Sequence, residues 1–208
     1  MMFKINPKNP QPRLVRKTTE ILQRGGVIIY PTDTTYGIGC DLFNKKAVER
    51  VYRIKAAESD KPLSFICADL KDLSRYAVGV SNYAYQTMRR LFPGPYTFVL
   101  RASKMVPKIM RSRQKTVGIR IPDHAVALAL VRELDNPVLS TSANFSGDEP
   151  INNPAEIQQL LGTQVDVILD CDVLPRVPST VVSLVGDKVE VLRAGAGDAS
   201  FFLELAAG

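Results

Sequence analysis

The sequence predicts an α/β protein with a twisted mixed sheet flanked by helices. Segments with the 3.6-residue spacing of amphipathic helices alternate with short β-branched apolar runs typical of buried strands. Two such runs near the carboxyl end flank Gly186-Asp187, which predicts an antiparallel hairpin and therefore a mixed sheet. The 208 residues contain no repeat and no linker rich in Pro, Gly or Ser, so we expect a single domain over residues 1–208.

The first half of the chain supplies four elements before residue 70. Residues 13–24 place apolar side chains on one helical face, and Gly25-Gly26 ends that predicted helix. The run VIIY at 27–30 predicts a buried strand. Helical spacing returns at 44–54, and LSFICA at 63–68 predicts the next strand.

The middle of the chain continues the alternation. Ser81 is a typical N-cap for a helix that runs to Phe92. PYTFVLRA at 95–102 and TVGIRIP at 116–122 predict two strands. HAVALALVREL at 124–134 predicts a helix, and PVLSTS at 137–142 predicts a strand.

The last third begins with a helix over residues 154–162, which has Pro at its start and Gly at its end. VDVILD at 165–170 predicts a strand. STVVSLV at 179–185 and KVEVLRA at 188–194 then form the predicted hairpin.

Composition indicates an ordinary globular protein with an excess of positive charge. Hydrophobic residues make up 45% and charged residues 23%, and the formal net charge is +6. Such an excess favours anionic partners, namely nucleotides, polyphosphates or RNA, although solvated surface charge is an equal alternative.

Targeting signals and disulfides are not predicted. The amino terminus lacks the apolar core of a signal peptide, and no apolar run reaches the ~20 residues of a membrane span, so we expect a cytoplasmic protein with no membrane partner. Cys40, Cys67 and Cys171 match no metal or disulfide spacing and are interpreted as small buried hydrophobes.

Two stretches in the first third of the chain are candidates for ligand binding. YPTDTTYGIGC at 30–40 follows a strand with the hydroxyls of Thr32, Thr34 and Thr35, which suit a polar ligand or a hydrogen-bonded turn. Lys55 stands at the end of a predicted helix, where it either faces an anion or complements the helix dipole.

Two further candidates lie in the second half of the chain. STSANFSG at 140–147 carries a dense set of donors and acceptors, which suits a phosphate or ribose, or alternatively a capped turn. Arg120 and Arg193 are placed in or at the end of predicted strands, where a buried arginine requires an anionic partner.

Several mechanisms are not supported by the sequence. His124 is the sole histidine and no GxSxG is present, which argues against a Ser-His-Asp triad. No HExxH or paired cysteines indicate zinc, so no protein metal site is predicted. The absence of GxxxxGKS excludes a P-loop ATPase.

Taken together, the ordered blocks in this chain resemble the YrdC-like family, which comprises the threonylcarbamoyl-adenylate synthases and their YciO-type relatives. The resemblance extends over a core of about residues 12–195, and the blocks are GGVIIYPTDTTYGIGCD, K followed by SDKPLSF, FPGPYTFVL, TVGIRIPDH, VLSTSANFSG, PSTVVSL and VLRAG.

The resemblance implies a concave basic cavity and a reaction. L-threonine, bicarbonate and ATP with Mg²⁺ would give threonylcarbamoyl-AMP and pyrophosphate, for the t6A modification of tRNA at position 37. It also implies an alternative, a YciO-type protein that binds a nucleotide, double-stranded RNA or tRNA with weak or different catalysis. It implies nothing about the oligomeric state.

The resemblance also assigns residues. Lys55, Ser142 and Asn144 match the catalytic KxR and SxN motifs, and these three with Thr116 and Arg193 match ATP contacts. Thr34, Arg120 and Ser179 match contacts to the substrate amino acid.

Three positions depart from the family pattern. The arginine of KxR is Ala57, an asparagine is Lys61, and a histidine of the amino-acid pocket is Ile66. We expect these departures to cluster on one wall of the cavity. A lysine cannot reproduce the bidentate grip of an arginine, so the pattern favours the YciO branch.

Overall fold

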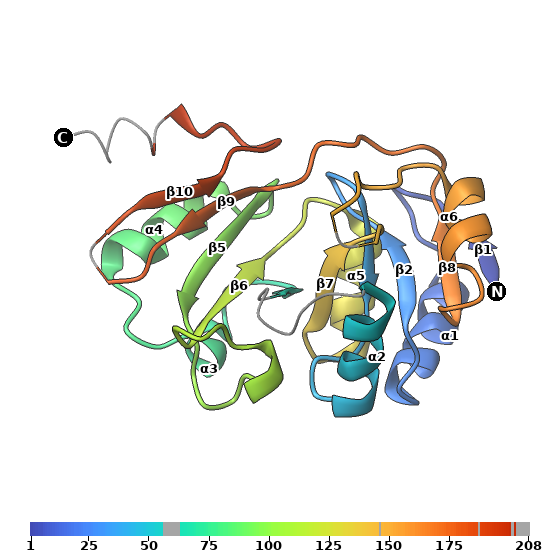
Figure 1. Cartoon of the computed structure of the whole chain (residues 1–208), viewed down its shortest axis with the longest axis horizontal. Coiled ribbons are helices and arrows are strands. Elements are labelled where there is room, and N and C mark those ends of the chain that lie inside the picture. Colours follow the sequence, from blue (N-terminus) through green and yellow to red (C-terminus); the bar gives the residue numbers. More distant parts are fainter. Residues whose placement is uncertain (56–62, 146, 187, 201, 203–208) are drawn as a thin grey trace.

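The computed structural model describes residues 1–55, 63–145, 147–186, 188–200 and residue 202. The predicted fold class is confirmed, because one mixed sheet with helices against it runs through the described residues (Figure 1). The predictions about Ala57 and Lys61 lie outside the described residues.

The sheet has ten strands in the order β1-β8-β2-β3-β7-β4-β6-β5-β9-β10. Parallel pairs join β1 to β8, β8 to β2, β4 to β6 and β5 to β9, and the remaining neighbours are antiparallel. The strand bounds are β1 Met2–Lys4, β2 Ile28–Pro31, β3 Tyr36–Gly39, β4 Ser64–Ile66, β5 Tyr96–Arg101, β6 Thr116–Arg120, β7 Val138–Ser142, β8 Val167–Asp170, β9 Thr180–Ser183 and β10 Glu190–Arg193.

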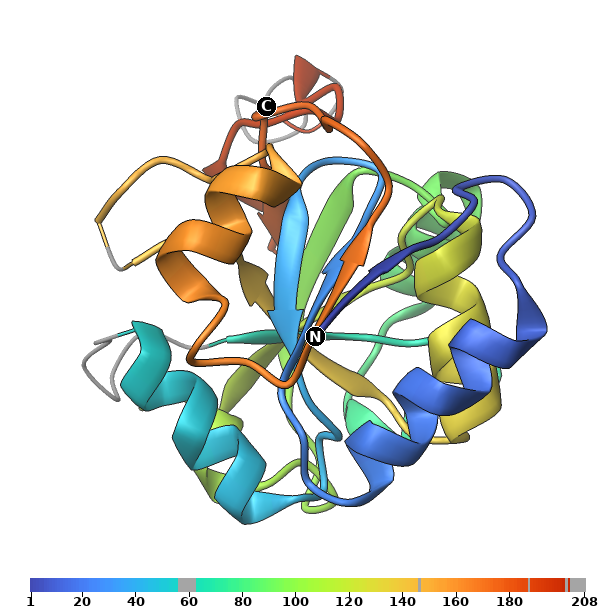
Figure 2. The same cartoon turned by 90° about the vertical axis from the view of Figure 1, so that its right-hand side faces the viewer.

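The helices cover both faces of the sheet. Their bounds are α1 Pro12–Gln23, α2 Lys45–Lys55, α3 Leu73–Tyr76, α4 Asn82–Leu91, α5 Ala125–Leu134 and α6 Pro154–Leu161, with a 3-10 turn η1 at Lys108–Met110. Figure 2 shows α1 and α5 on one side of the sheet, with α2 and α6 on the other. The two faces therefore bury separate apolar clusters.

Helix starts follow the predicted capping chemistry. Ser81 Oγ accepts a hydrogen bond from the amide of Ala84 over 3.2 Å, and Asn153 Oδ1 accepts from Ala155 over 2.9 Å. His124 caps α5, because its Nδ1 accepts from the amide of Val126 over 3.3 Å. This contact gives His124 a structural role at the start of α5.

Two short strands were not predicted. β1 has three residues and is defined by pairing with β8 rather than by its own pattern. β3 begins within the stretch 30–40, where glycines suggested a ligand loop, so that prediction is corrected from Tyr36 onward. A Cβ on Gly39 would lie 2.5 Å from the carbonyl oxygen of Leu139, so glycine here permits close strand packing.

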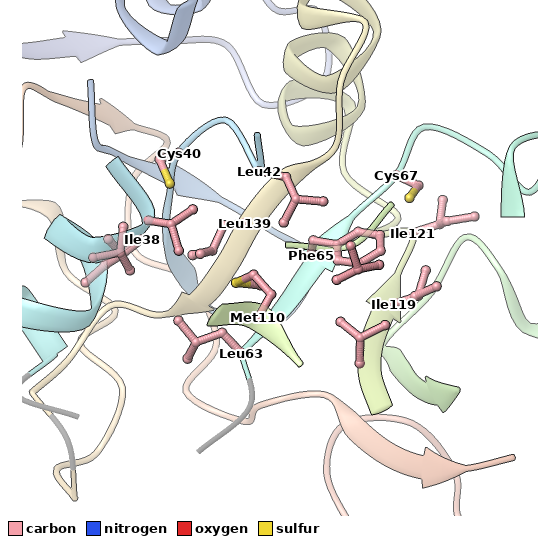
Figure 3. Packing of buried hydrophobic residues seen from close by; sticks show 14 of the residues in the cluster. Ile38, Cys40, Leu42, Leu63, Phe65, Cys67, Met110, Ile119, Ile121 and Leu139 are labelled. Atoms are coloured by element: carbon pink, nitrogen blue, oxygen red, sulfur yellow. The ribbon is translucent and has the colours of Figure 1, made fainter. Parts of the chain in front are cut away.

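Register places one row of large apolar side chains on the sheet. Phe65 pairs with Leu139 of β7 and with Ile119 of β6, and all three are at most 1% exposed. Figure 3 shows these residues with Ile38 of β3 in one packed cluster. The three cysteines are buried and free, as predicted. Among the described residues, no helix is long and apolar enough to cross a membrane.

Candidate functional site

A polar cavity of about 270 Å³ opens on the sheet between β3 and β10. Strand alternation forms it, because Ser64 pairs with Ser140 and Gly118 and all three face away from Phe65. Its lining includes the hydroxyl residues Thr32, Thr34, Thr35, Ser64, Thr97, Thr116, Ser140, Thr141, Ser142 and Ser179, and two cations, Arg120 and Arg193. This volume is near the lower limit of ~300–1,000 Å³ for ligand pockets.

Arg120 is held at the cavity by the turn that follows β2. Its Nη2 donates to Thr34 Oγ1 over 2.8 Å and also to Asp33 Oδ1. The side chains of Arg120 and Asp33 are only 8% and 13% exposed. Arg120 Nε and Asp33 Oδ2 are buried and have no hydrogen-bond partner among the described residues.

The turn itself is fixed by Thr32. Its hydroxyl donates to the carbonyl of Thr35 over 2.7 Å and accepts from the amides of Thr34 and Thr35, each over 3.2 Å. The alternative of a hydrogen-bonded turn is therefore confirmed for residues 32–35. The same turn places the hydroxyl of Thr34 at the cavity.

At the end of β7, Ser142 lines the cavity and Lys55 contacts it from α2. Lys55 Nζ donates to the carbonyls of Ser142 over 2.9 Å and Asn144 over 2.6 Å, and to Asn144 Oδ1 over 2.5 Å. Ser142 Oγ also donates to Asn144 Oδ1 over 2.6 Å. Burial lowers the pKa of Lys55 to about 8, and the charge of Asp148 opposes that shift.

The opposite wall carries Arg193. Its Nε and Nη2 donate to the carbonyl of Ser179 over 3.1 and 2.8 Å, while the hydroxyls of Ser179 and Thr97 share a hydrogen bond of 2.8 Å. Burial first, and the charge of Arg120 second, lower the pKa of Arg193. Two guanidinium groups that repel each other electrostatically across a hydroxyl-lined cavity favour an anionic ligand.

The cavity brings six of the predicted residues together: Thr34, Thr116, Arg120, Ser142, Ser179 and Arg193. Lys55 and Asn144 are not part of its lining, although both contact Ser142. The functional roles of all eight residues stay predictions, as does the basic character of the cavity, since Arg120 is paired with Asp33.

We expected the three departures from the family pattern to lie on one wall of the cavity, and the structure corrects this expectation for Ile66. Ile66 is fully buried and belongs to the apolar cluster under α5, so it does not line the cavity. It pairs with Arg120 along the sheet, and its side chain packs with Tyr30 and Val138 instead.

Sequence reasoning missed four polar residues at or beneath the cavity. Thr97 and Ser64 lie inside strands, and only the register of neighbouring strands brings them to the cavity. Asp33 stands between Thr32 and Thr34, which were identified as candidate ligand-binding residues. An acidic residue in that turn was the signal that could have indicated a partner for a buried arginine. Tyr30 donates to Ser140 Oγ over 2.6 Å from beneath the cavity, and no sequence pattern indicated that contact.

Comparison with known proteins gives a family match and close structural neighbours. The family described as "Telomere recombination" (Sua5, YciO and YrdC) matches residues 20–195. The chain is 41% identical to the protein YciO of Escherichia coli over 203 residues, covering 97% of this chain and 98% of YciO. The crystal structure of E. coli YciO superposes with a TM-score of 0.92 at 40% identity, over 97% of this chain and 98% of the other.

Two further comparisons involve a protein with a named activity and a structure with a bound ligand. The threonylcarbamoyl-AMP synthase of Vibrio vulnificus is 36% identical over 158 residues, which is 74% of this chain and 84% of the synthase. The crystal structure of P. abyssi Sua5 complexed with L-threonine matches with a TM-score of 0.92 at 26% identity, over 100% of this chain and 61% of that one.

Proposed function

The chain belongs to the Sua5/YciO/YrdC family, and from that premise we propose that it is a threonylcarbamoyladenylate synthase-like protein. The observation that carries the proposal is the hydroxyl-lined cavity with Arg120 and Arg193 on its walls. Its substrates would be L-threonine, bicarbonate and ATP, with Mg²⁺ bound to the phosphates of ATP.

Two bonds form in the proposed reaction. The threonine amine bonds to the carbon of bicarbonate and water leaves, which gives a carbamate. A carbamate oxygen then bonds to the α-phosphorus of ATP, and pyrophosphate leaves. The protein's part in such phosphoryl chemistry is mainly alignment and charge stabilisation.

The described contacts support a division of the cavity into two ends. Arg120 and Thr34 line the cavity side by side, and this pair suits the carboxylate and hydroxyl of threonine, with Ser179 as a further contact. Thr116, Ser142 and Arg193 would bind the nucleotide. Lys55 and Asn144 support that end from outside the lining.

The test is to incubate the protein with ATP, Mg²⁺, bicarbonate and L-threonine, and to measure pyrophosphate and the adenylate product. We expect pyrophosphate release that depends on threonine and on bicarbonate. Arg120→Met should abolish the dependence on threonine, whereas Arg101→Met, at the exposed end of β5, should not. Pyrophosphate release that is the same without threonine would refute the proposal.

A second function follows from one specific feature, the replacement of the KxR arginine by Ala57, together with the net charge of +6. Here the protein is a YciO-type protein that binds a nucleotide, tRNA or double-stranded RNA, with weak or different catalytic activity. RNA affinity should then fall steeply between 50 and 200 mM salt, because phosphate contacts release counterions. RNA affinity that does not change with salt would exclude this function.

A further inference from the structure

The ammonium group of Lys55 has no hydrogen left for a ligand. A lysine ammonium carries three N–H donors and no acceptor. All three find oxygen partners within the protein, two carbonyls and Asn144 Oδ1, over 2.5 to 2.9 Å. The side chain is also buried, with the residue 5% exposed. A phosphate could bind Lys55 only by displacing one of these charge-assisted bonds.

The oxygens that Lys55 binds belong to one short segment at the cavity edge. Asn144 Oδ1 accepts from both Lys55 and Ser142 Oγ, and Asn144 Nδ2 donates to the carbonyl of Asp148 over 2.5 Å. The amide of Ala143 meanwhile donates to the carbonyl of Tyr36 on β3 over 2.8 Å. Lys55 therefore ties α2 to the end of β7 through the residues on either side of Ala143.

From these contacts we infer that Lys55 is a positioning residue, which fixes Ser142 and Asn144 at the cavity instead of binding the ligand itself. The orientation of the Ser142 hydroxyl depends on Asn144 Oδ1, and Asn144 Oδ1 is held by Lys55. The lysine acts on the ligand through these two side chains. This inference rests on the proposed function only for the identity of the ligand used in part of its test.

The first measurement needs no ligand. In Lys55→Met the backbone amides of Ala143 and Ile151, which bond to the carbonyls of Tyr36 and Ala143, should exchange with deuterium at least about tenfold faster. Amides of α1 and α5, remote from this segment, should exchange at the wild-type rate. Lys46→Met, an exposed lysine on the same helix, is the matched control and should change neither set.

The second measurement separates positioning from direct phosphate binding. If Lys55 only positions Ser142, Lys55→Met and Ser142→Ala should weaken adenosine, AMP and ATP in the same proportions, and Lys46→Met should weaken none. A loss in Lys55→Met that grows more steeply with the number of phosphates than the loss in Ser142→Ala would overturn the inference. Unchanged exchange at Ala143 and Ile151 in Lys55→Met would overturn it as well.

A third measurement uses the wild-type protein, in case Lys55→Met does not fold. A lysine held in three hydrogen bonds should give a distinct ¹⁵Nζ NMR signal that ATP leaves in place. A large shift of this signal with ATP would overturn the inference. If ATP also leaves the amides of Thr116 and Arg193 unchanged, the proposed nucleotide function fails, while the hydrogen-exchange result still decides the role of Lys55.

Discussion

Arg120 Nη2 donates a 2.8 Å hydrogen bond to the hydroxyl of Thr34, and the two side chains meet at a cavity although β6 and the 32–35 turn are not adjacent in the sheet. The same nitrogen donates to Asp33, which brings a buried carboxylate against the guanidinium. One arginine therefore both stabilises this turn and lines the cavity.

Arg120→Met should lower the free energy of unfolding by about 3–5 kcal/mol, because it leaves Asp33 buried without its cation. Urea denaturation at pH 7 measures the loss. Arg101→Met removes an exposed arginine of the neighbouring strand and should cost no more than about 0.5 kcal/mol. Equal losses in the two variants would mean that the Asp33 pair adds nothing to folding.

Arg193→Met should weaken ATP binding by roughly 10- to 100-fold, the cost of a lost charge-assisted hydrogen bond. Unfolding should change less than in Arg120→Met, since the Arg193 residue is largely exposed and only its guanidinium is partly buried against Ser179. Isothermal titration calorimetry gives the affinity, and Arg89→Met on α4 serves as a control for the loss of one positive charge. Wild-type affinity in Arg193→Met would remove this residue from the binding site.

Gly39→Ala should destabilise the protein by about 1–3 kcal/mol, because the new methyl group would meet the carbonyl of Leu139 at 2.5 Å and the ring of Tyr30 at 2.8 Å. At Gly37 the nearest atoms of Tyr30 lie 3.2 to 3.3 Å away, so Gly37→Ala should cost less. Thermal unfolding of both variants checks the order. A smaller loss for Gly39→Ala than for Gly37→Ala would contradict the close packing of β3 on β7.

Lys55 should make stability depend on pH above neutrality. Burial lowers its pKa from 10.5 to about 8 in the folded protein, so between these values the unfolded chain holds one more proton than the folded chain. The free energy of unfolding contributed by Lys55 therefore rises with pH in this window, by up to about 3 kcal/mol. Urea denaturation of the wild type and of Lys55→Met from pH 7 to 10.5 isolates the contribution of Lys55 to the free energy of unfolding. If the two plots of this free energy against pH stay parallel, the pKa of Lys55 is not lowered by folding.

Periodicity and turn chemistry predicted most of the fold. The helix capped by Ser81, the helix that starts with Pro154, and the hairpin β9–β10 all lie where their local patterns indicated. β3 was missed because Gly37 and Gly39 are atypical of a strand, although it pairs with the preceding β2. β1 was missed because it has three residues and pairs with the distant β8. Local patterns contain no information about such pairing.

The candidate site was predictable at the level of residue types but not of orientation. The resemblance selected Thr34, Arg120, Ser142 and Arg193, which do line one cavity. It also selected Lys55, and only the three bonds to carbonyl and amide oxygens show that its ammonium points elsewhere. Ile66 and Ser64 lie on the same face of β4, but α5 covers only the end that carries Ile66. The sequence did not indicate which end of that strand would be covered.

The strand order has a consequence for how the protein acquires its cavity. Walls come from residues 32–37, 140–142 and 178–193, and about a hundred positions separate the first two segments, so strands distant along the chain must pair before the hollow exists. Contacts so distant along the chain form slowly. On a ribosome, a nascent chain that ends before residue 178 lacks the wall formed by Ser179 and Arg193, so the cavity is completed only after β9 and β10 have been synthesised.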